Sequence, residues 1–418
     1  MREMAVGLGG VDKVVVVGGG QAGAQTCFSL RQWGYEGAIT LVGEEAVPPY
    51  QRPPLSKEFL KGVLPEERLY FKPSAWYEDN GVDLMLSVRA EAIDRAGRVV
   101  TLEHGGSISY DALVLATGSR PRPLPIAGAD LKNVFELRSI ADVERLAPQM
   151  VAGRKVVIVG AGYIGLEAAA VSRFMGLDVV VLEMADRVLA RVTSPFMSEF
   201  YEKEHRAQNV DVRCNTRLAE LTGEDGAVTA AVLGDGSKIE ADLVLVGIGI
   251  LPNEELASAA GIACNSGILV DEDARTNDPR IFATGDCARR PLVHYGRIGR
   301  LESVHNAIEQ GKLAAAAILG RDRPPVDAPW FWSDQYDLKL QIAGLSDGYD
   351  EIAVRGDVDD RKFAAFYLRN GQLIAVDAVN SAPEFMAAKR MIAAGARLAP
   401  GELTDMSISM KDIMKRVS

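Results

Sequence analysis

The chain has 418 residues and a formal net charge of −11 at pH 7, with 48% hydrophobic and 25% charged residues. This length predicts two or three domains, each large enough for its own hydrophobic core. The acidic balance argues against nucleic acids and anionic membranes as partners. No apolar run approaches the roughly 20 residues that span a bilayer, and the N-terminus lacks a secretory pattern, so we expect a cytoplasmic protein.

The first recognisable motif lies near the N-terminus. Four consecutive valines, Val14–Val17, predict a strand that is buried on both faces of a parallel sheet. Gly18, Gly20 and Gly23 follow with the spacing of a dinucleotide-binding turn. In such a turn the first glycine closes the loop, the second admits a pyrophosphate and the third lets the next helix pack closely. That helix is expected from Ala24 to Trp33.

An acidic residue follows at the place that this motif requires. A second strand is expected over Ala38–Val42, and Glu44 comes 21 residues after Gly23, where a carboxylate binds a ribose. Strand, glycine turn, helix and acid together indicate a dinucleotide site. A βαβ turn with a purely structural role remains the alternative.

The same pattern returns in the middle of the chain. A strand over Lys155–Val159 leads into Gly160, Gly162 and Gly165, which open a helix expected from Tyr163 towards Met175. A further strand, Asp178–Leu182, ends at Glu183, 18 residues after Gly165. Two complete motifs predict two bound dinucleotides. A duplicated fold with one inactive site remains the alternative.

Glu183 also predicts which dinucleotide the second site prefers. Its carboxylate can accept a hydrogen bond from a ribose 2′-hydroxyl but repels a 2′-phosphate, so we expect NADH to be favoured over NADPH. Arg187 is the nearest cation after it, and a swing of that side chain towards a phosphate would weaken the preference.

The strand pattern predicts an α/β protein with two Rossmann-like dinucleotide-binding domains, one inserted in the other, and a C-terminal α+β domain. Buried strands are expected at Tyr110–Gly118, Asp242–Val246 and Ile281–Ala283, and Asp286 follows the last of them at the carboxyl end of a sheet. The expected boundaries are 1–118 and 248–326 for the first domain, 119–247 for the second, and 327–418 for the C-terminal domain. In the last, strands are expected at 350–355, 361–368 and 372–379, and a helix at 383–394.

Two other segments have sequence patterns that predict their local structure. The proline-rich stretch Pro48–Lys57 predicts a rigid extended loop that carries Arg52 and Lys57, with Ser56 capping a helix through Leu60. Short antiparallel strands are expected between Arg89 and Ser109.

The cysteines point away from dithiol and metal chemistry. The chain has four of them, with neither zinc-ligand spacing nor a Cys-x-x-Cys pair, and no metal site is expected. Cys27 and Cys287 are expected to be buried thiols.

Four stretches carry a resemblance that covers essentially the whole chain: Tyr50–Lys57, Gly162–Glu167, Thr284–Asp286 and Pro329–Tyr336. In them the chain resembles flavoproteins of the glutathione-reductase type, and more narrowly the ferredoxin reductases of haem-thiolate monooxygenase and Rieske dioxygenase systems. The resemblance implies that the first motif binds FAD, that the second binds NADH, and that the C-terminal domain forms part of the face that docks a partner.

The resemblance also implies the cofactor-binding residues. These are Gly18, Gly20, Gln21, Ala22, Gly23, Glu44, Arg52, Lys57, Thr117, Gly118, Arg138, Gly160, Gly162, Tyr163, Ile164, Gly165, Glu183, Gly249, Asp286, Glu302, Ser303, Val304 and Trp332.

The resemblance also implies catalytic roles for Lys57, Glu167 and Trp332. Lys57 is expected to approach flavin N5 and to pair with Glu167 across a domain boundary, and Trp332 to lie by the edge of the flavin ring. Tyr163 is expected to shield the nicotinamide pocket. The alternatives are core packing for Trp332 and a structural role for His305, which adjoins the expected backbone donors at 302–304.

Disulfide reductases carry a redox cysteine pair where this chain has its proline-rich loop, so electrons must leave the flavin differently. The resemblance implies hydride transfer from NADH to FAD and single-electron transfer to a [2Fe-2S] ferredoxin that serves an oxygenase, by a monomer or weak homodimer. The alternatives are an NADH oxidase or a quinone-reducing flavoenzyme, and a redox interaction protein that responds to NADH. For an acidic ferredoxin, the expected basic docking residues are Arg297, Arg300, Lys339, Lys389 and Arg390.

Overall fold

The computed structural model describes residues 10–417; the first nine residues of the first predicted domain, and residue 418, lie outside the description. The backbone divides into two compact units. The first unit consists of the residues up to 51, 66–120 and 251–327, and the second of 52–65, 121–250 and the residues from 328 onward. The three-domain division expected from the sequence remains a prediction.

The first unit is built on a five-stranded parallel sheet with the strand order β19-β7-β1-β2-β3. Its strands are β1 (Lys13–Val17), β2 (Ala38–Val42), β3 (Val82–Met85), β7 (Ala112–Leu115) and β19 (Ile281–Ala283). The four valines of β1 are 6% exposed or less, because Val14 and Val16 belong to one core cluster and Val15 and Val17 to another. The strands β2 and β7 pair with its two edges. The late strand β19 pairs with β7, as expected for a domain that resumes after an insertion.

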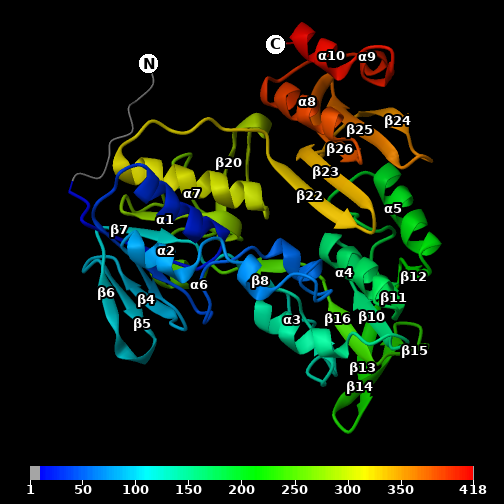
Figure 1. Cartoon of the computed structure of the whole chain (residues 1–418), viewed down its shortest axis with the longest axis horizontal. Helices are drawn as coiled ribbons and strands as arrows, with labels where there is room; N and C mark the ends of the chain where they lie inside the picture. Colours follow the sequence, from blue (N-terminus) through cyan, green and yellow to red (C-terminus); the bar gives the residue numbers. More distant parts are fainter. Residues whose placement is uncertain (1–9, 418) are drawn as a thin grey trace. The chain divides into compact units, whose positions relative to one another are not determined.

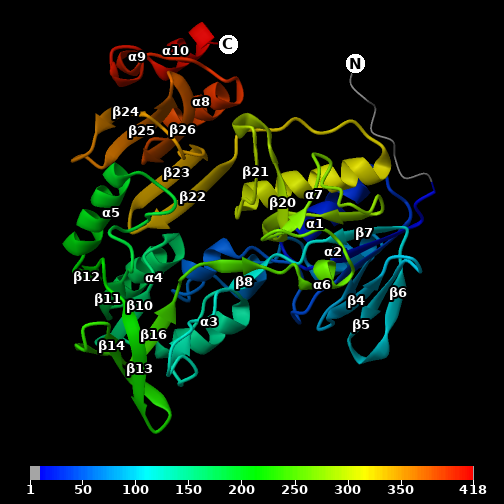
Figure 2. The ribbon, with the colours of Figure 1, turned by 180° about the vertical axis from the view of Figure 1, so that it is seen from behind.

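Two helices of the first unit lie side by side on this sheet (Figures 1 and 2). They are α1 (Gln21–Gln32) and α7 (Val304–Leu319). A Cβ atom on Gly311 of α7 would lie 2.9 Å from the Ala22 carbonyl oxygen of α1, so glycine is what lets the two backbones approach. The start of α1 is thereby fixed from two directions, by the sheet and by α7.

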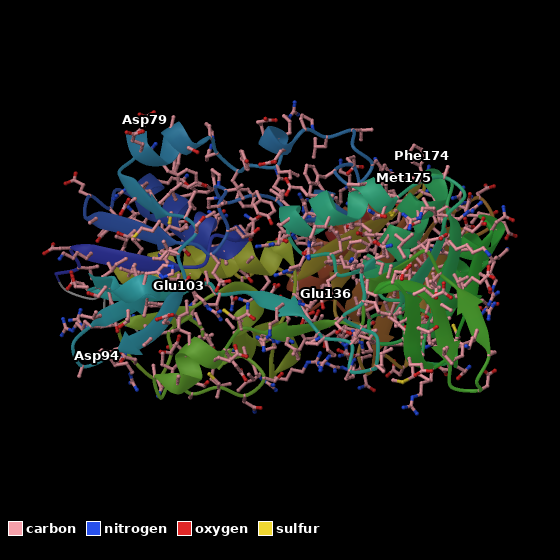
Figure 3. The ribbon with its side chains drawn as sticks, turned by 90° about the horizontal axis from the view of Figure 1, so that it is seen from below. Asp79, Asp94, Glu103, Glu136, Phe174 and Met175 are labelled. Atoms are coloured by element: carbon pink, nitrogen blue, oxygen red, sulfur yellow. The ribbon has the colours of Figure 1, made fainter. Side chains whose placement is uncertain are left out.

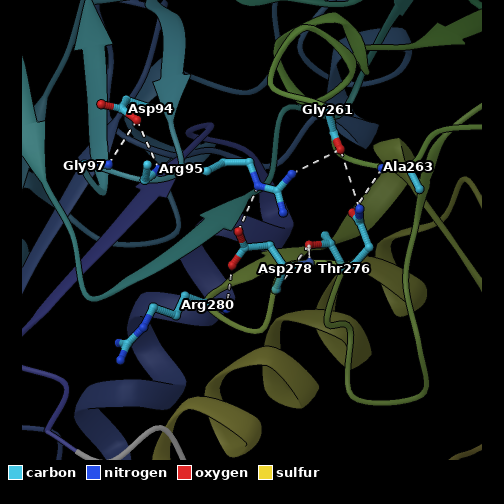
Figure 4. A network of polar contacts seen from close by, with 10 residues as sticks. Asp94, Arg95, Gly97, Gly261, Ala263, Thr276, Asp278 and Arg280 are labelled. Carbon is cyan, nitrogen blue, oxygen red and sulfur yellow. Dashed lines mark hydrogen bonds and ion pairs between the residues drawn. The ribbon is translucent and has the colours of Figure 1, made fainter.

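Smaller elements complete the first unit. They are α2 (Ser74–Asp79), β4 (Ala90–Asp94), β5 (Val99–Leu102), β6 (Ser107–Ser109), α6 (Glu255–Ala259), β18 (Ile268–Leu269), β20 (Ala288–Leu292) and β21 (Arg297–Gly299). The β4-β5-β6 sheet is antiparallel, as predicted. In Figure 4 the guanidinium group of Arg95 reaches the Asp278 carboxylate at 2.8 Å and the Gly261 carbonyl at 3.2 Å, tying this sheet to the late segment.

The second unit contains a parallel sheet with the order β12-β11-β10-β16-β9. Its strands are β9 (Val134–Phe135), β10 (Lys155–Val159), β11 (Asp178–Leu182), β12 (Val210–Arg213) and β16 (Leu243–Val246), and its helices are α3 (Ile140–Leu146), α4 (Tyr163–Phe174) and α5 (Pro195–Ala207). An antiparallel sheet of β13 (Leu218–Glu224), β14 (Ala227–Leu233) and β15 (Lys238–Glu240) accompanies it. Figure 3 labels Phe174 and Met175, where α4 ends; the Phe174 ring is 72% exposed.

The second unit also holds an antiparallel sheet with the order β22-β23-β26-β25-β24 (Figure 2). Its strands are β22 (Trp330–Gln335), β23 (Leu338–Gly344), β24 (Glu351–Asp357), β25 (Lys362–Arg369) and β26 (Gln372–Val379). The helices α8 (Ala382–Ala393), α9 (Pro400–Thr404) and α10 (Met410–Val417) follow. The prediction found β24, β25, β26 and α8, but it did not find β22, β23, α9 or α10.

One arginine of β24 holds the end of the chain. Arg355 is 5% exposed and donates hydrogen bonds to the carbonyl oxygens of Leu403, Asp405 and Ile408. Its guanidinium group also lies 3.5 Å from the Glu384 carboxylate of α8. The side chain therefore joins the sheet to the segment that contains α9 and leads into α10.

Two short strands occupy stretches where the chain passes between the units: β8 (Ser119–Pro121) and β17 (Ile250–Pro252). The prediction of a helix capped by Ser56 is wrong. A single 3-10 turn covers Pro53–Ser56, and turns follow to Leu60. Ser56 has no α-helix to cap; its hydroxyl instead donates to the carboxylate of Glu167 at 2.6 Å.

None of the helices in the part of the chain that the structure describes is long and apolar enough to cross a bilayer. The Cys27 and Cys287 side chains are buried free thiols, as predicted.

Candidate functional site

The glycine turn of the first unit has the shape of a phosphate cradle. Gly18 has a φ of +119°, and a Cβ atom there would lie 2.1 Å from the Ala116 carbonyl oxygen. A Cβ atom on Gly23 would lie 2.0 Å from the Gly18 carbonyl oxygen, so both positions exclude every side chain. A Cβ atom on Gly20 would meet nothing within 4 Å. The open space at the middle glycine and the uncapped start of α1, at Gln21 and Ala22, suit a pyrophosphate.

The carboxyl ends of β7 and β19 bring further predicted residues of the first unit together. The Thr117 hydroxyl donates to the Asn253 carbonyl at 2.6 Å, and the Asn253 amide donates back to the Thr117 carbonyl at 2.9 Å. This exchange fixes the turn at Gly118, whose φ is +66°. Asp286 follows β19, and its carboxylate accepts a hydrogen bond from the Ser119 hydroxyl at 2.8 Å.

Three buried polar atoms around the turn at Asp286 fit a polar ligand. The Thr284 hydroxyl, the Asn306 side-chain oxygen and the Gln310 side-chain nitrogen have no hydrogen-bond partner within residues 10–417. The Gln310 side-chain oxygen does accept from the Gly285 backbone N–H at 2.6 Å, so these groups lie in one place. Buried polar groups are usually satisfied. The first unit therefore fits FAD, with the dinucleotide at the glycine turn and polar groups of α7 and the Gly285 turn beside it.

The start of α7 supplies the predicted backbone donors. Ser303 caps the helix by accepting from the Asn306 backbone N–H at 3.1 Å, and Val304 is the first helical residue. Glu302 forms an ion pair with Arg300 at 2.6 Å. Arg300 also donates to the Asp286 carbonyl at 3.2 Å, and its side chain is only 16% exposed. Local acceptors therefore hold its guanidinium group, and a role of Arg300 in docking stays a prediction.

Glu44, the acid of the first motif, lies at the surface. Its carboxylate is 3.2 Å from the Arg89 guanidinium group, and both side chains are 68% exposed. Solvent therefore surrounds the ion pair, and the Glu44 carboxylate can accept a further hydrogen bond.

The glycine turn of the second unit repeats the geometry of the first. Gly160 has a φ of +103°, and a Cβ atom there would lie 2.5 Å from the Gly247 carbonyl oxygen. A Cβ atom on Gly165 would lie 2.0 Å from the Gly160 carbonyl oxygen, whereas one on Gly162 would meet nothing within 4 Å. Ile164, in the first turn of α4, is 45% exposed. This cradle fits a second pyrophosphate by the same criteria.

Glu183 is bound to its own glycine turn. One carboxylate oxygen accepts from the Ala161 backbone N–H at 2.7 Å and the other from the Ala185 backbone N–H at 2.9 Å. Arg187 is engaged as well, because it donates to the Thr193 and Ala190 carbonyls and to the Ser198 hydroxyl. The arginine is therefore held in its own loop, which removes the cation that would have favoured a 2′-phosphate.

Gly249 lies beside an exposed cation. A Cβ atom on Gly249 would be 3.2 Å from a guanidinium nitrogen of Arg191, so a side chain at this position would displace the arginine. Arg191 is exposed and follows the Glu183 loop in the sequence. Gly249 thus keeps a positive charge near the carboxyl end of the second sheet.

Tyr163 opens α4 and points its hydroxyl group inward. Its ring packs on Phe331 with a centroid distance of 4.9 Å. The hydroxyl is buried and has no hydrogen-bond partner in the described part of the chain. Burial raises the pKa of Tyr163 well above its ordinary value, and the carboxylate of Asp377 adds to the effect.

Lys57 and Glu167 form a buried ion pair. The ammonium nitrogen lies 2.7 Å from a Glu167 carboxylate oxygen, and the side chains are 10% and 2% exposed. That oxygen also accepts from the Ser56 hydroxyl at 2.6 Å, while the other accepts from the Ser333 hydroxyl at 2.7 Å. The carboxylate thus has three donors, which offsets the cost of removing the two charges from water.

Aromatic rings of β22 surround the remaining predicted catalytic residue. Trp332 is partly buried, with ring centroids 5.6 Å from Trp330 and 6.3 Å from Phe331. Asp334 follows on the same strand; burial raises its pKa, and the nearby charge of Lys57 lowers it.

Arg52 and Arg138, both predicted to bind the cofactor, lie next to each other. The Arg52 guanidinium group donates to the Arg138 carbonyl at 2.7 Å. The Arg138 backbone N–H in turn donates to the Asp142 carboxylate at 3.0 Å, at the start of α3. This contact fixes the proline-rich loop to the segment before α3.

The sequence analysis did not find Ser333 and Asp334 as neighbours of the Lys57–Glu167 pair. Its only signal was the Trp332-Ser333-Asp334 run inside the stretch that carried the family resemblance. No spacing rule connects residue 333 to residue 167, because the contact depends on how β22 lies against α4.

Comparisons with known proteins agree with this geometry. The family described as pyridine nucleotide-disulphide oxidoreductase matches residues 12–311, and the reductase C-terminal family matches residues 330–414. Putidaredoxin reductase CamA of Pseudomonas putida is 43% identical over 96% of this chain and 97% of its own. The ferredoxin–NAD(+) reductase component of the biphenyl dioxygenase system of Paraburkholderia xenovorans is 36% identical, over 97% and 99%.

Among solved structures, the covalent putidaredoxin reductase–putidaredoxin complex superposes with a TM-score of 0.95 at 43% identity. The match covers 97% of this chain and 99% of the other. The two sheets, the two glycine turns and the antiparallel C-terminal sheet are therefore shared over almost the full length. The chain belongs to the pyridine nucleotide-disulphide oxidoreductase family and, within it, to the ferredoxin reductases.

Proposed function

We propose that this protein is an FAD-dependent NADH:ferredoxin oxidoreductase. The observation that carries the proposal is the pair of equivalent glycine cradles, one in each unit, in a chain that has no Cys-x-x-Cys pair. Two dinucleotides without a dithiol imply a hydride donor, a flavin and an external electron acceptor. When bound, FAD supplies the ability to accept a hydride and to release electrons one at a time.

The residues of the second unit support NADH as the donor. The Glu183 carboxylate is held at the glycine turn by two backbone N–H groups, where it can accept from a ribose 2′-hydroxyl. Arg187 is held away by three acceptors of its own loop. A 2′-phosphate would therefore meet a fixed negative charge without a compensating cation from Arg187.

We assign Lys57, Glu167 and Trp332 to the flavin. A buried lysine stabilises the negative charge that reduction places on the cofactor, and a carboxylate with three donors keeps that lysine oriented. Trp332 presents a partly buried ring that suits the edge of an isoalloxazine.

The relatives name the kind of acceptor. Putidaredoxin reductase and the biphenyl dioxygenase reductase component support a ferredoxin partner for this chain. We propose that the partner is a [2Fe-2S] ferredoxin that serves a monooxygenase or a Rieske dioxygenase, that the enzyme works in the cytoplasm as a monomer or weak homodimer, and that the C-terminal domain, 327–418, takes part in docking. Lys339 and Arg390 are exposed and remain candidates for that face.

The test is steady-state NADH oxidation by the purified flavoprotein with a panel of small iron–sulfur proteins. We expect fast turnover with a [2Fe-2S] ferredoxin, slow turnover with oxygen or a quinone alone, and a higher kcat/KM for NADH than for NADPH. Rapid NADH oxidation without any protein acceptor would replace the proposal with an oxidase. Negligible turnover together with NADH-dependent partner binding would indicate a redox interaction protein.

A further inference from the structure

We propose that Ser333, Gln335, His205 and Tyr336 form a one-directional chain of hydrogen bonds that positions the Glu167 carboxylate, and through it Lys57. The inference rests on the proposed role of the Lys57–Glu167 pair in flavin reduction. It assigns these four side chains as positioning residues.

The chain is continuous and lies entirely in the second unit. Ser333 donates to Glu167 at 2.7 Å, and the Gln335 amide nitrogen donates to the Ser333 hydroxyl oxygen at 3.1 Å. The Gln335 amide oxygen lies 2.8 Å from Nε2 of His205. Nδ1 of His205 lies 2.9 Å from the Tyr336 hydroxyl.

The direction of every bond follows from the carboxylate at the end. The ionised Glu167 carboxylate can only accept hydrogen bonds, so the Ser333 hydroxyl must donate its single proton to it. The Ser333 oxygen is then left to accept, which requires the nitrogen of the Gln335 amide on that side. The amide oxygen therefore faces His205 and can only accept.

The last two links are fixed in the same way. Because the Gln335 oxygen accepts, Nε2 of His205 must carry a proton, and in a neutral ring Nδ1 then accepts from the Tyr336 hydroxyl. This requires a neutral imidazole with one ring proton. His205 is fully buried, and burial lowers its pKa to about 4, so the neutral form prevails around neutral pH.

The chain connects distant parts of the second unit. His205 lies near the C-terminal end of α5, Glu167 on α4, and Ser333 and Gln335 on β22. Tyr336 begins the two-residue turn between β22 and β23 with a φ of +58°, which is strained for a tyrosine. Its hydroxyl bond to His205 and the ring contact between them, with centroids 5.1 Å apart, hold that turn in place.

The consequence for the ion pair is geometric. Ser333 occupies one carboxylate oxygen, and Ser56 and Lys57 share the other. The carboxylate cannot rotate without breaking a bond at both oxygens. Within the described structure, the Lys57 ammonium group makes one other hydrogen bond, to the Pro53 carbonyl at 3.4 Å, so the orientation of Glu167 sets that of the lysine.

Stopped-flow reduction of the flavin by saturating NADH tests the proposal. Ser333→Ala and Gln335→Met should each slow reduction about tenfold, which corresponds to about 1.4 kcal/mol in the barrier, without weakening NADH binding. Ser333→Thr restores a hydroxyl and should recover most of the rate. The matched control is Thr193→Val, which removes another buried hydroxyl donor to a carboxylate, Asp377, and should leave the rate unchanged.

A second readout does not depend on activity. The chain has four histidines, so ¹⁵N NMR of the imidazole rings can resolve His205 after comparison with a His205→Gln variant. In the wild-type protein we expect a neutral ring protonated at Nε2. In Gln335→Met the acceptor of that proton is gone, and the spectrum should shift towards a mixture of tautomers. A wild-type His205 that is protonated at Nδ1 would overturn the assignment.

The outcomes separate this proposal from the proposed function. Slow reduction in Lys57→Ala, together with wild-type rates in both Ser333→Ala and Gln335→Met, overturns the chain and leaves the function intact. A wild-type enzyme that does not reduce any ferredoxin overturns the function, while the His205 tautomer still decides the hydrogen-bond direction. If Ser333→Ala does not fold, Gln335→Met, which keeps the volume of the glutamine, carries the kinetic test.

Discussion

The two glycine turns have almost the same backbone and different surroundings. In both, the first glycine has a positive φ and the third lies against the carbonyl of the first, while the middle one faces open space. Gln21 follows the middle glycine of the first turn, and Tyr163 follows that of the second. Glu44 pairs with Arg89 at the surface, whereas Glu183 is bound to the turn itself.

These differences correspond to two ways of holding a dinucleotide. The first turn opens towards polar groups of Thr284, Asn306 and Gln310 that have no partner within residues 10–417, as suits a cofactor that stays bound. The second turn has an acid that is already oriented and an aromatic ring that packs on Phe331, as suits a substrate that exchanges. We therefore expect the shared turn to provide the phosphate site, and the neighbouring residues to determine how long a dinucleotide stays bound and which dinucleotide binds.

The largest effects should come from the third glycine of each turn. In Gly23→Ala and in Gly165→Ala the new Cβ atom would lie 2.0 Å from a carbonyl oxygen, which forces the helix away from its strand. We expect Gly23→Ala to purify without flavin. Gly165→Ala should retain flavin that dithionite reduces and NADH does not. Flavin absorbance per protein and stopped-flow reduction measure the two outcomes.

Alanine at the middle glycines is the control for those variants. A Cβ atom on Gly20 or Gly162 meets no protein atom within 4 Å, so both variants should unfold at the wild-type temperature. If either variant failed to fold, the space beside the middle glycine would be needed by the protein itself and would not be available for a ligand.

The next effect concerns a buried acid near the second turn. Asp377 accepts from the Tyr367 hydroxyl at 2.7 Å and from the Thr193 hydroxyl, and burial raises its pKa from 3.8 to about 6. The native state therefore holds this proton more tightly than the unfolded chain. The resulting stability is fully present below about pH 4 and is lost as pH rises through about 6, a change of about 3 kcal/mol.

Asp377→Asn stays neutral at every pH and should remove this dependence. Urea unfolding at about pH 4 and about pH 8 gives the free energies of unfolding. We expect the wild-type protein to lose about 3 kcal/mol more than the variant between the two values. If the free energy of unfolding changed equally with pH in the two proteins, the Asp377 carboxylate would be solvated or paired in solution.

A smaller effect is expected from the two acids, Glu183 and Glu44, which should contribute differently to nucleotide binding. Glu183→Gln keeps the shape of the side chain and removes its charge, so kcat/KM for NADH should fall about tenfold and that for NADPH should rise. Glu44→Gln should weaken FAD retention only slightly, because exposed ion pairs contribute about 0–1 kcal/mol. A larger loss in Glu44→Gln would show that the surface acid carries the ribose contact.

The smallest effect should come from the tyrosine of the second turn. The Tyr163 hydroxyl is buried without a partner in the described structure, so Tyr163→Phe should change the free energy of unfolding by less than about 1 kcal/mol, towards greater stability. Tyr367→Phe is the matched control, because it removes a donor from Asp377 and should cost about 1–3 kcal/mol. Chemical denaturation of both variants makes the comparison.

The sequence was most informative where local rules decide the structure. The strands β2, β10 and β11 begin and end at the predicted residues because short runs rich in β-branched side chains strongly favour a strand. The glycine spacing predicted both turns. One acid after the second strand of each motif, Glu44 in the first and Glu183 in the second, was likewise predicted from spacing alone.

The parts that were missed depend on tertiary contacts. Ser56 was expected to cap a helix, yet it ends a 3-10 turn and its hydroxyl donates a hydrogen bond to a carboxylate 111 residues away. The contact between Gln335 and His205 spans 130 residues, and that between Ser333 and Glu167 spans 166. No periodicity connects such pairs, and β22 was not predicted because its three aromatic residues show no alternation of polar and apolar side chains.

The arginine of β24 gives the end of the chain a cooperative character. Arg355 bonds three carbonyl groups spread over Leu403, Asp405 and Ile408, so one side chain holds the whole segment. When the Arg355 guanidinium group moves away, all three carbonyl groups lose their hydrogen-bond donor together. We therefore expect local opening of the tail to be a single event rather than progressive fraying, with the amides from α9 to the start of α10 exchanging with solvent as one unit.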